Sequence, residues 1–177
     1  MALRSYQGKH PRIDAGAYVD DMALVVGDVE IGTDSSIWPM CVVRGDVNTI
    51  RIGKGTNIQD GSVLHVTHRS ERNSGGHALV VGDRVTVGHK VILHGCSIGN
   101  ECLIGMGSIV MDGVVVEDRV LLGAGSLVPP GKTLQSGYLY LGNPVRRVRP
   151  LNDRELGDFD YSARHYMRLK DEYLGQV

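Results

Sequence analysis

Histidine is the residue type in this sequence with the clearest capacity for chemistry. His65 lies in the segment SVLHV, His94 lies in the similar segment VILHG, and His89 lies five residues before His94. Neutral imidazoles are common zinc ligands, and three of them leave a fourth position open for water or substrate, as in catalytic zinc sites. An isolated surface histidine is usually only a solvated residue, and the spacing of His89 and His94 is weak evidence by itself. The elements that carry the three histidines therefore decide whether they can meet.

An aliphatic residue recurs at every sixth position along most of the chain. Small or β-branched residues come four positions later, and glycine often follows the aliphatic residue directly. A period of six fits neither an α-helix, at about 3.6, nor one long strand, at about 2. It is typical of short strands joined by tight turns, where glycine adopts backbone angles that other residues resist. Eighteen positions of this repeat are Val, Ile or Leu: Ile13, Val19, Val25, Ile31, Ile37, Val43, Ile52, Ile58, Leu64, Val81, Val87, Leu93, Ile98, Ile104, Val110, Val116, Leu122 and Val128.

Three such strands make one coil of a triangular prism, so the repeat predicts an all-β solenoid of about six coils. A narrow aliphatic core suits a chain with 24 Gly but only one Trp and one Phe. The pattern resembles that of the hexapeptide-repeat superfamily, whose prism is a left-handed parallel β-helix. The left hand is implied by this resemblance alone, because general rules favour a right-handed crossover. We assign residues 1–150 to this β-helix domain.

The repeat is interrupted in three places. Three extra residues follow Val43, eleven follow Leu64, and one residue is missing after Leu93. We place the eleven-residue insertion at 67–77 (THRSERNSGGH), where its polar sequence predicts a loop at a corner of the prism. Such a loop could carry function, as loops on rigid scaffolds often do, or could be a solvated excursion.

Residues 151–177 follow a different pattern. Asn152 with Glu155 three positions later indicates the start of a helix. Apolar residues then recur at helical spacing, which predicts a C-terminal α-helix packed on the prism in a structural role. The residues of this face are Leu156, Phe159, Ala163, Tyr166, Leu169 and Tyr173.

The hexad register also assigns residues to the three faces of the prism. With Ile13 on face A, the aliphatic residues that precede Arg44, His65 and His94 all fall on face C, in successive coils. These three residues should therefore form one column, spaced by the strand separation of about 4.8 Å. Two stacked histidines favour a metal site far more than one histidine does.

His89 falls on face B, near the corner with face C. Asp60 has the equivalent place one coil earlier, with Gln59 beside it. Faces B and C of one subunit diverge, so His89 is not expected to share an ion with the column in its own chain, given the need for distances of about 2.0–2.1 Å. Packing face C of one prism against the corner of a neighbour would bring the three imidazoles together. Repeated around a threefold axis, this contact closes a ring and predicts a homotrimer.

Four segments resemble the signature of γ-class carbonic anhydrases in order and spacing: VRGD (43–46), NIQD (57–60), LH (64–65) and GHKVILHG (88–95). Nearly the whole chain, including LHVTH, GYLYLGNP and the DEYL ending, resembles the bacterial YrdA group of that family. The resemblance implies a metal between subunits, held by His65 and His94 of one chain and by His89 of the next. It implies Zn²⁺, with Fe²⁺ or Co²⁺ as alternatives, because imidazole suits several divalent ions.

The resemblance also implies an activity and roles for four further residues. A metal ion held in this way lowers the pKa of bound water to about 7, and attack of hydroxide on carbon dioxide gives bicarbonate. Gln59 would orient the hydroxide or the substrate, Arg44 and Asp46 would form an ion pair across the interface and help to hold bicarbonate, and Asp60 would anchor the same network. Without the histidines, residues 44–46 would read as a turn with a surface ion pair of little energetic value, and Gln59 and Asp60 as solvated corner residues.

Two positions depart from the archetypal enzyme. That pattern has glutamates directly after the aspartate of the RGD-like motif and three residues beyond the first histidine, where this chain has Val47 and His68. The expected proton shuttle is then missing, unless His68 replaces it, since an imidazole titrates near pH 6.5. His68 could equally be an idle loop residue. Slow turnover and a different substrate both remain open.

Two other functions fit the same fold. A hexapeptide acyltransferase shares the prism and the trimer, uses a histidine as general base and binds an acyl donor between subunits. A non-catalytic trimeric scaffold would keep the metal only to clamp its subunits. An acyltransferase of this kind does not require a stacked histidine pair with a third histidine at the facing corner.

Composition narrows the remaining classes. With 19 Lys and Arg against 20 Asp and Glu, the chain lacks the basic footprint of a nucleic-acid-binding protein. The sequence shows neither a signal-like start nor an apolar run of about 18 residues that could span a membrane, so we expect a cytoplasmic protein. Three cysteines without a CxxC pair fit a reducing compartment.

Overall fold

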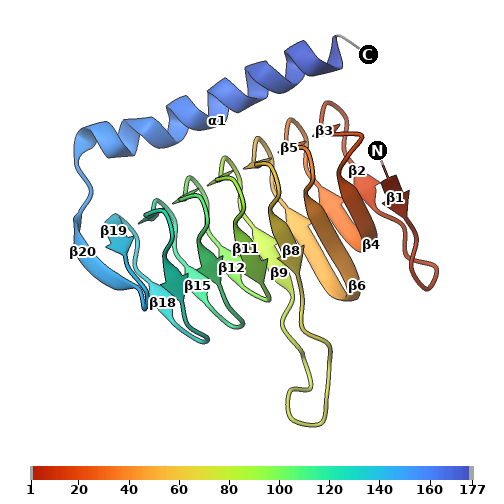
Figure 1. The fold of residues 1–177 in the computed structure, drawn as a ribbon, viewed down its shortest axis with the longest axis horizontal. Coiled ribbons are helices and arrows are strands. Elements are labelled where there is room, and N and C mark those ends of the chain that lie inside the picture. Colours follow the sequence, from red (N-terminus) through yellow and green to blue (C-terminus); the bar gives the residue numbers. More distant parts are fainter. Residues whose placement is uncertain (1, 176–177) are drawn as a thin grey trace.

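The computed structural model describes residues 2–175, which form a three-sided stack of coils with one long helix along it (Figure 1). Strand follows strand in parallel register from coil to coil, and the last pair, β19 with β20, is antiparallel. The fold is the left-handed parallel β-helix of hexapeptide repeats that the sequence pattern and the resemblance together predict.

Two hydrogen-bonded sheets build the three faces. Face B carries the smaller sheet, whose eight strands in the described chain are β3 (Tyr18–Val19), β5 (Ser36–Ile37), β7 (Asn57–Ile58), β10 (Thr86–Val87), β13 (Leu103–Ile104), β16 (Leu121–Leu122), β19 (Tyr138–Leu141) and β20 (Arg146–Pro150). Faces A and C share the larger sheet, whose twelve strands within residues 2–175 are β1 (Ala2–Arg4), β2 (Arg12–Ile13), β4 (Leu24–Ile31), β6 (Val42–Ile52), β8 (Val63–His65), β9 (Leu79–Val81), β11 (Ile92–His94), β12 (Ser97–Ile98), β14 (Ile109–Val110), β15 (Val115–Val116), β17 (Leu127–Val128) and β18 (Thr133–Leu134).

The aliphatic repeat forms the core of the prism. Of the eighteen repeat positions, all except the partly buried Ile13 are buried. Branched aliphatic side chains pack well on the pleated surface of a strand, and each coil covers the apolar residues of the next. The repeat continues past Val128, because Leu134 and Tyr140 are buried at the next two positions.

The extra residues after Val43 do not form a loop. They lengthen β6 to 11 residues, so that this strand pairs with β8 on face C and then with β9 on face A. β4 follows the same path beside it, with a register shift between Gly27 and Val29. A continuous strand therefore turns the edge between two faces at the place where the hexad repeat is interrupted.

Residues 67–77 leave the prism between β8 and β9 and project from it as a narrow loop (Figure 1). The two ends of the loop are joined by a pair of backbone hydrogen bonds between Thr67 and His77, of 2.9 and 3.0 Å. The base of the loop is therefore held against the corner of the prism, close to the end of β8.

Helix α1 (Asp153–Leu174) lies along face B, against β5, β7 and β10 (Figure 1). It begins at the predicted capping box, since Asn152 Oδ1 accepts a hydrogen bond from the Glu155 backbone N–H at 2.9 Å and Glu155 Oε2 accepts one from the Asn152 N–H at 3.0 Å. Phe159 and Ala163 of the predicted apolar face are buried. No helix within residues 2–175 has the length and hydrophobicity needed to cross a membrane.

Candidate metal centre

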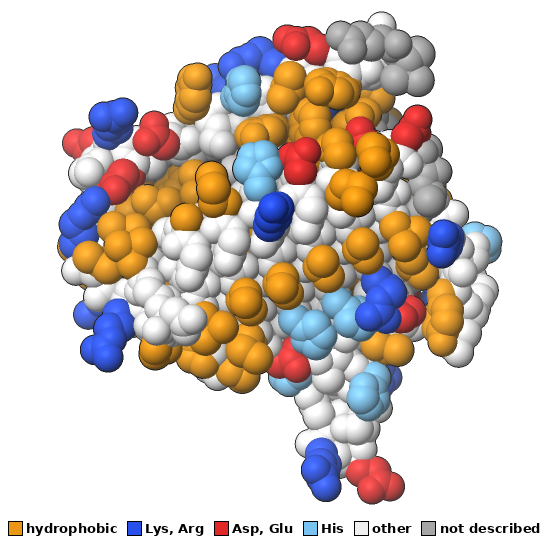
Figure 2. Space-filling view, in the orientation of Figure 1, with side chains coloured by type: hydrophobic (Ala, Val, Ile, Leu, Met, Phe, Trp, Pro, Cys, Tyr) orange, Lys and Arg blue, Asp and Glu red, His pale blue; other side chains and the backbone are white. Residues whose placement is uncertain are grey.

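His65 and His94 lie side by side at the ends of β8 and β11. The strand register pairs the two residues directly, as the hexad spacing predicts. Their ring centroids are 5.3 Å apart and the ring planes meet at 80°. Figure 2 shows histidine side chains gathered below a row of hydrophobic side chains and above the projecting loop. One face of the prism therefore presents an imidazole pair to its surroundings.

In each of the three candidate ligands, Nδ1 of the imidazole ring lies at hydrogen-bond distance from an oxygen atom. The distances are 2.8 Å from His65 to the Arg44 carbonyl oxygen, 2.6 Å from His94 to Asp112 Oδ1, and 2.9 Å from His89 to Asp60 Oδ2. A carbonyl or carboxylate oxygen only accepts, so Nδ1 carries the hydrogen and the lone pair of the neutral ring lies on Nε2. Metal-ligating histidines characteristically donate their other N–H in this way. The donor set therefore fits a divalent metal ion.

His89 is separated from the other two histidines within the chain. It follows β10 on face B, near the corner with face C, and its side chain is 46% exposed. Within the described residues, no three His, Cys, Asp or Glu side chains of one chain gather into a group that could hold a metal. His89 and its partner Asp60 are both partly exposed, with 46% and 50% of their side chains accessible.

Arg44 and Asp46 form an ion pair within one chain, with 2.5 Å between Arg44 Nη1 and Asp46 Oδ2. The pair was expected across the subunit interface. It forms locally because side chains two residues apart on an extended strand point to the same side. Burial opposes the charge on Asp46, but the hydrogen bond and charge of Arg44 outweigh it, so the pKa of Asp46 lies below its ordinary value. Asp46 Oδ1 is buried, without a hydrogen-bond partner in the described chain, 3.8 Å from His65 Nδ1.

Gln59 lies on the other sheet, just beyond β7 on face B, and is only 5% exposed. Its Nε2 donates a hydrogen bond to Asn57 Oδ1 at 3.0 Å, and Asn57 in turn donates to Thr86 Oγ1 at 3.0 Å. Thr86 is 2.9 Å from the Ser162 hydroxyl of α1. Helix α1 thus helps to fix the amide of Gln59, which is not the solvated corner residue that its sequence position allows.

Sequence reasoning missed Asp112, which follows β14 and contacts His94. Burial raises the pKa of this carboxyl, but hydrogen bonds from Thr67 and His94 outweigh that effect, so its pKa lies below the ordinary value and Asp112 is charged at neutral pH. Thr67 and His77, at the base of the loop, also lie beside it. The signal in the sequence was the position of Asp112, two residues after Val110, which is the next face-C repeat residue after Leu93.

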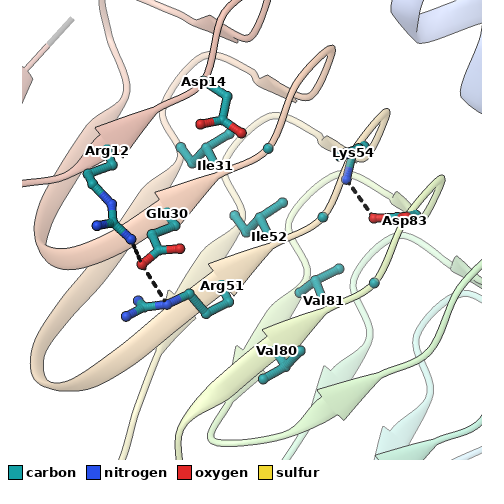
Figure 3. Close-up of a pocket in the computed structure, with 13 residues that line it drawn as sticks. Arg12, Asp14, Glu30, Ile31, Arg51, Ile52, Lys54, Val80, Val81 and Asp83 are labelled. Atoms are coloured by element: carbon teal, nitrogen blue, oxygen red, sulfur yellow. Dashed lines mark hydrogen bonds and ion pairs between the residues drawn. The ribbon is translucent and has the colours of Figure 1, made fainter.

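A groove of about 500 Å³ lies elsewhere, on the face-A strands and the turns that follow them (Figure 3). Several of its charged side chains already have partners in the chain. Glu30 pairs with Arg12 and, at 3.0 Å, with Arg51 Nε, while Asp83 Oδ1 accepts a hydrogen bond from the Lys54 backbone N–H at 2.8 Å. The groove contains no histidine among its lining residues. The candidate chemistry therefore stays with the histidines.

Comparisons with known proteins bear on this arrangement. The family model for bacterial transferase hexapeptide (six repeats) matches residues 95–130. The chain is 56% identical to protein YrdA of Escherichia coli (strain K12), over 98% of this chain and 95% of that protein. It is 45% identical to the mitochondrial gamma carbonic anhydrase 1 of Arabidopsis thaliana, over 95% of this chain and 61% of that longer protein. It is 42% identical to a carbonic anhydrase of Geobacillus kaustophilus (strain HTA426), over 95% of this chain and 88% of that protein.

A solved structure has the same fold over almost its full length. The crystal structure of a hexapeptide transferase family protein from Anaplasma phagocytophilum is similar with a TM-score of 0.90 and 42% sequence identity. The match covers 97% of this chain and 98% of that chain. The similarity therefore includes the coils that carry the histidines and the C-terminal helix.

Proposed function

This chain belongs to the γ-class carbonic anhydrase-like family of hexapeptide-repeat proteins, and from that membership we propose that it catalyses the reversible hydration of carbon dioxide to bicarbonate. The reaction takes place at a metal site between the subunits of a homotrimer. One observation carries the proposal. In His65, His89 and His94, Nδ1 makes a hydrogen bond to an oxygen atom, which leaves Nε2 with the lone pair that a metal ligand needs. We propose Zn²⁺ as the metal, with Fe²⁺ or Co²⁺ as alternatives.

The three neutral imidazoles would hold the metal ion with one position open, and the ion would lower the pKa of water there to about 7 and so supply hydroxide at neutral pH. The histidines of this chain contribute their fixed orientation. Asp60 holds His89 at 2.9 Å, and the Arg44 carbonyl oxygen holds His65 at 2.8 Å. Ligands oriented before the metal binds need little reorganisation when it does.

The surface around the histidines supports the trimer. Val63 and Ile92 precede the histidine pair on the outer side of face C and are each 39% exposed. On the corner that carries His89, Met106 lies one coil beyond it and Met40 two coils before it, and they are 58% and 61% exposed. Apolar side chains gathered on a surface favour contact with another protein surface. Packing this corner on face C of a neighbour would cover both sets and bring His89 to the histidine pair.

Three polar side chains complete the site. The Arg44 guanidinium, held by Asp46, offers donors that suit the planar bicarbonate anion. Gln59, fixed through Asn57, orients the reactants by hydrogen bonding. Asp46 also keeps its buried Oδ1 3.8 Å from His65 Nδ1. Val47 cannot carry a proton, and the exposed His68 is the remaining candidate for that task, so we expect slow turnover that external buffer accelerates.

Metal content and subunit mass of the wild type and of His89→Ala test the proposal. The wild type should be a trimer with one metal per chain, and His89→Ala should lose most of its metal because each site loses one of three ligands. His10→Ala is the matched control, since His10 is exposed and pairs only locally with Ser5. Full metal retention by a trimeric His89→Ala variant would count against the site.

Activity then separates the three functions. Stopped-flow hydration of carbon dioxide, measured on zinc-, iron(II)- and cobalt-loaded protein, should exceed that of His89→Ala. The similarity to hexapeptide transferases supports the acyltransferase as the second candidate, and saturable binding of an acyl-coenzyme A would favour it. A trimer that dissociates when the metal is removed and shows no hydration with any of the three metals would instead be a clamped scaffold.

We also place the protein in the cytoplasm. The three cysteines are free and buried, which suits a reducing compartment.

A further inference from the structure

The base of the 67–77 loop is fixed far more firmly than a solvated excursion requires. Thr67 and His77 exchange two backbone hydrogen bonds. Asn48 Nδ2, from the extended part of β6, donates to the carbonyl oxygens of Thr67 and Gly75, each at 3.1 Å. Among the described hydrogen bonds, the tip (residues 69–74) is joined by contacts between Ser70 and Asn73 and by one from the Gly76 N–H to the Asn73 carbonyl oxygen, all within the loop. The structure thus ties down the base and leaves the tip projecting.

The fixed base contacts the carboxylate that contacts a candidate metal ligand. Asp112 Oδ2 accepts a hydrogen bond from the Thr67 hydroxyl at 2.7 Å, while Asp112 Oδ1 is 2.6 Å from His94 Nδ1. His77 lies against the two glycines that flank this contact, since a Cβ added at Gly95 would be 2.6 Å from His77 Cβ and one added at Gly113 would be 3.2 Å from His77 Cε1. Both oxygens of Asp112 are therefore engaged, one by the loop and one by the histidine.

We propose that Asp112, held by Thr67, is a positioning residue that fixes the ring orientation and tautomer of His94, and that the loop serves the metal site through its base rather than its tip. This inference rests on the proposed function, because it concerns a ligand of the same site. If the Asp112 carboxylate were free to rotate about its Cβ–Cγ bond, it could break its hydrogen bond with His94 Nδ1. The Thr67 hydroxyl restricts this rotation by holding the other carboxylate oxygen. His65 needs no such device, since its acceptor is a backbone carbonyl that the strand already fixes.

The chemistry of the acceptor separates positioning from packing. Asp112→Leu keeps the branched shape of the side chain but removes both acceptor oxygens, whereas the amide of an asparagine could still turn its oxygen toward Nδ1. Nothing then favours the hydrogen on Nδ1, and the neutral ring is free to carry it on Nε2, where the metal binds. Thr67→Val keeps the shape of Thr67 and removes only the hydroxyl.

The test measures binding of Zn²⁺ and Co²⁺ by competition with a chromophoric chelator, together with the absorption spectrum of the cobalt form. We expect Asp112→Leu to weaken metal binding about 10- to 100-fold, the usual effect of losing a ligand's hydrogen-bond partner, and to alter the cobalt spectrum. Thr67→Val should weaken it about 2- to 10-fold, the effect of one hydrogen bond. Asp118→Leu is the matched control, because Asp118 caps Asn100 at a turn and contacts no histidine in the described chain.

The tip is tested by replacing residues 69–74 with a two-glycine turn, which should leave metal affinity unchanged. Wild-type affinity and spectrum in a folded, trimeric Asp112→Leu variant would overturn the inference, as would a shortened loop that weakens binding as much as Thr67→Val does. Should Asp112→Leu fail to fold, Thr67→Val with unchanged affinity would overturn it equally. A wild type that binds neither metal would refute the proposed function instead.

Discussion

Three glycines in one column offer a graded test of the packing beside His94. Gly95, Gly113 and Gly131 occupy successive coils and have φ angles of +54°, +68° and +70°. An alanine in this left-handed region costs about 1–2 kcal/mol wherever it is placed. The surroundings differ, because a Cβ at Gly131 would meet no atom within 4 Å, whereas one at Gly95 would be 2.6 Å from His77 Cβ and closer still to Asp112 Oδ1.

The expected magnitudes follow from these distances. Ordinary contact begins at 3.4 Å, so Gly95→Ala must displace its neighbours by about 0.8 Å or more, and overpacking of this kind costs about 1–3 kcal/mol beyond the backbone strain. The same displacement would lengthen the 2.6 Å contact between His94 and Asp112 to about 3.4 Å, outside good hydrogen-bond geometry. Gly131→Ala should therefore lower the free energy of unfolding by about 1–2 kcal/mol and leave the metal affinity unchanged. Gly95→Ala should lower the free energy of unfolding further and weaken metal binding.

The assay is denaturant unfolding of both variants and of Gly113→Ala, with zinc affinity measured in parallel. Protein concentration must be the same throughout, because the apparent stability of an oligomer depends on it. The order of stability should be Gly131→Ala, then Gly113→Ala, then Gly95→Ala. Equal unfolding free energies for the first and last of these would refute the proposed crowding of Asp112 and His77 around Gly95.

Three further outcomes are expected. Burial raises the pKa of Cys41 to about 11 and those of Cys96 and Cys102 to about 12, so the native protein at pH 8 should not react with dithiobis-nitrobenzoate, and prompt labelling without denaturant would contradict this burial. The hydrogen bonds of Arg149 lower the pKa of Glu155 from 4.5 to about 2. Because the pKa is lower in the folded state, this pair stabilises the protein above pH 4.5 and loses its effect as the pH falls toward 2. Glu155→Gln should therefore flatten the acid limb of a stability–pH profile measured by circular dichroism. Removing metal by dialysis against a chelator should lower the melting temperature, since free zinc at 100 times its Kd stabilises the native state by about 2.7 kcal/mol, and an unchanged melting temperature would argue that no metal binds.

The sequence alone determined the solenoid and the stacked pair within it. In a stack of coils each residue contacts its equivalent in the next coil, so spacing along the chain translates directly into contacts. That is why the hexad register correctly paired His65 with His94 despite the eleven-residue insertion between their coils. The capping box at Asn152 was equally readable, because both of its hydrogen bonds join residues three positions apart.

Only the tertiary structure decided what the interruptions of the repeat do. The extra residues of β6 turn a corner as strand and supply Asn48 to the base of the loop. The loop in turn supplies Thr67 to Asp112, 45 residues away. Periodicity cannot locate such contacts, because an insertion has no equivalent in the neighbouring coils and its side chains find partners through space. The sequence thus placed the imidazoles and put Asp60 one coil before His89, whereas folding brought Thr67 of the loop to the carboxylate that contacts His94.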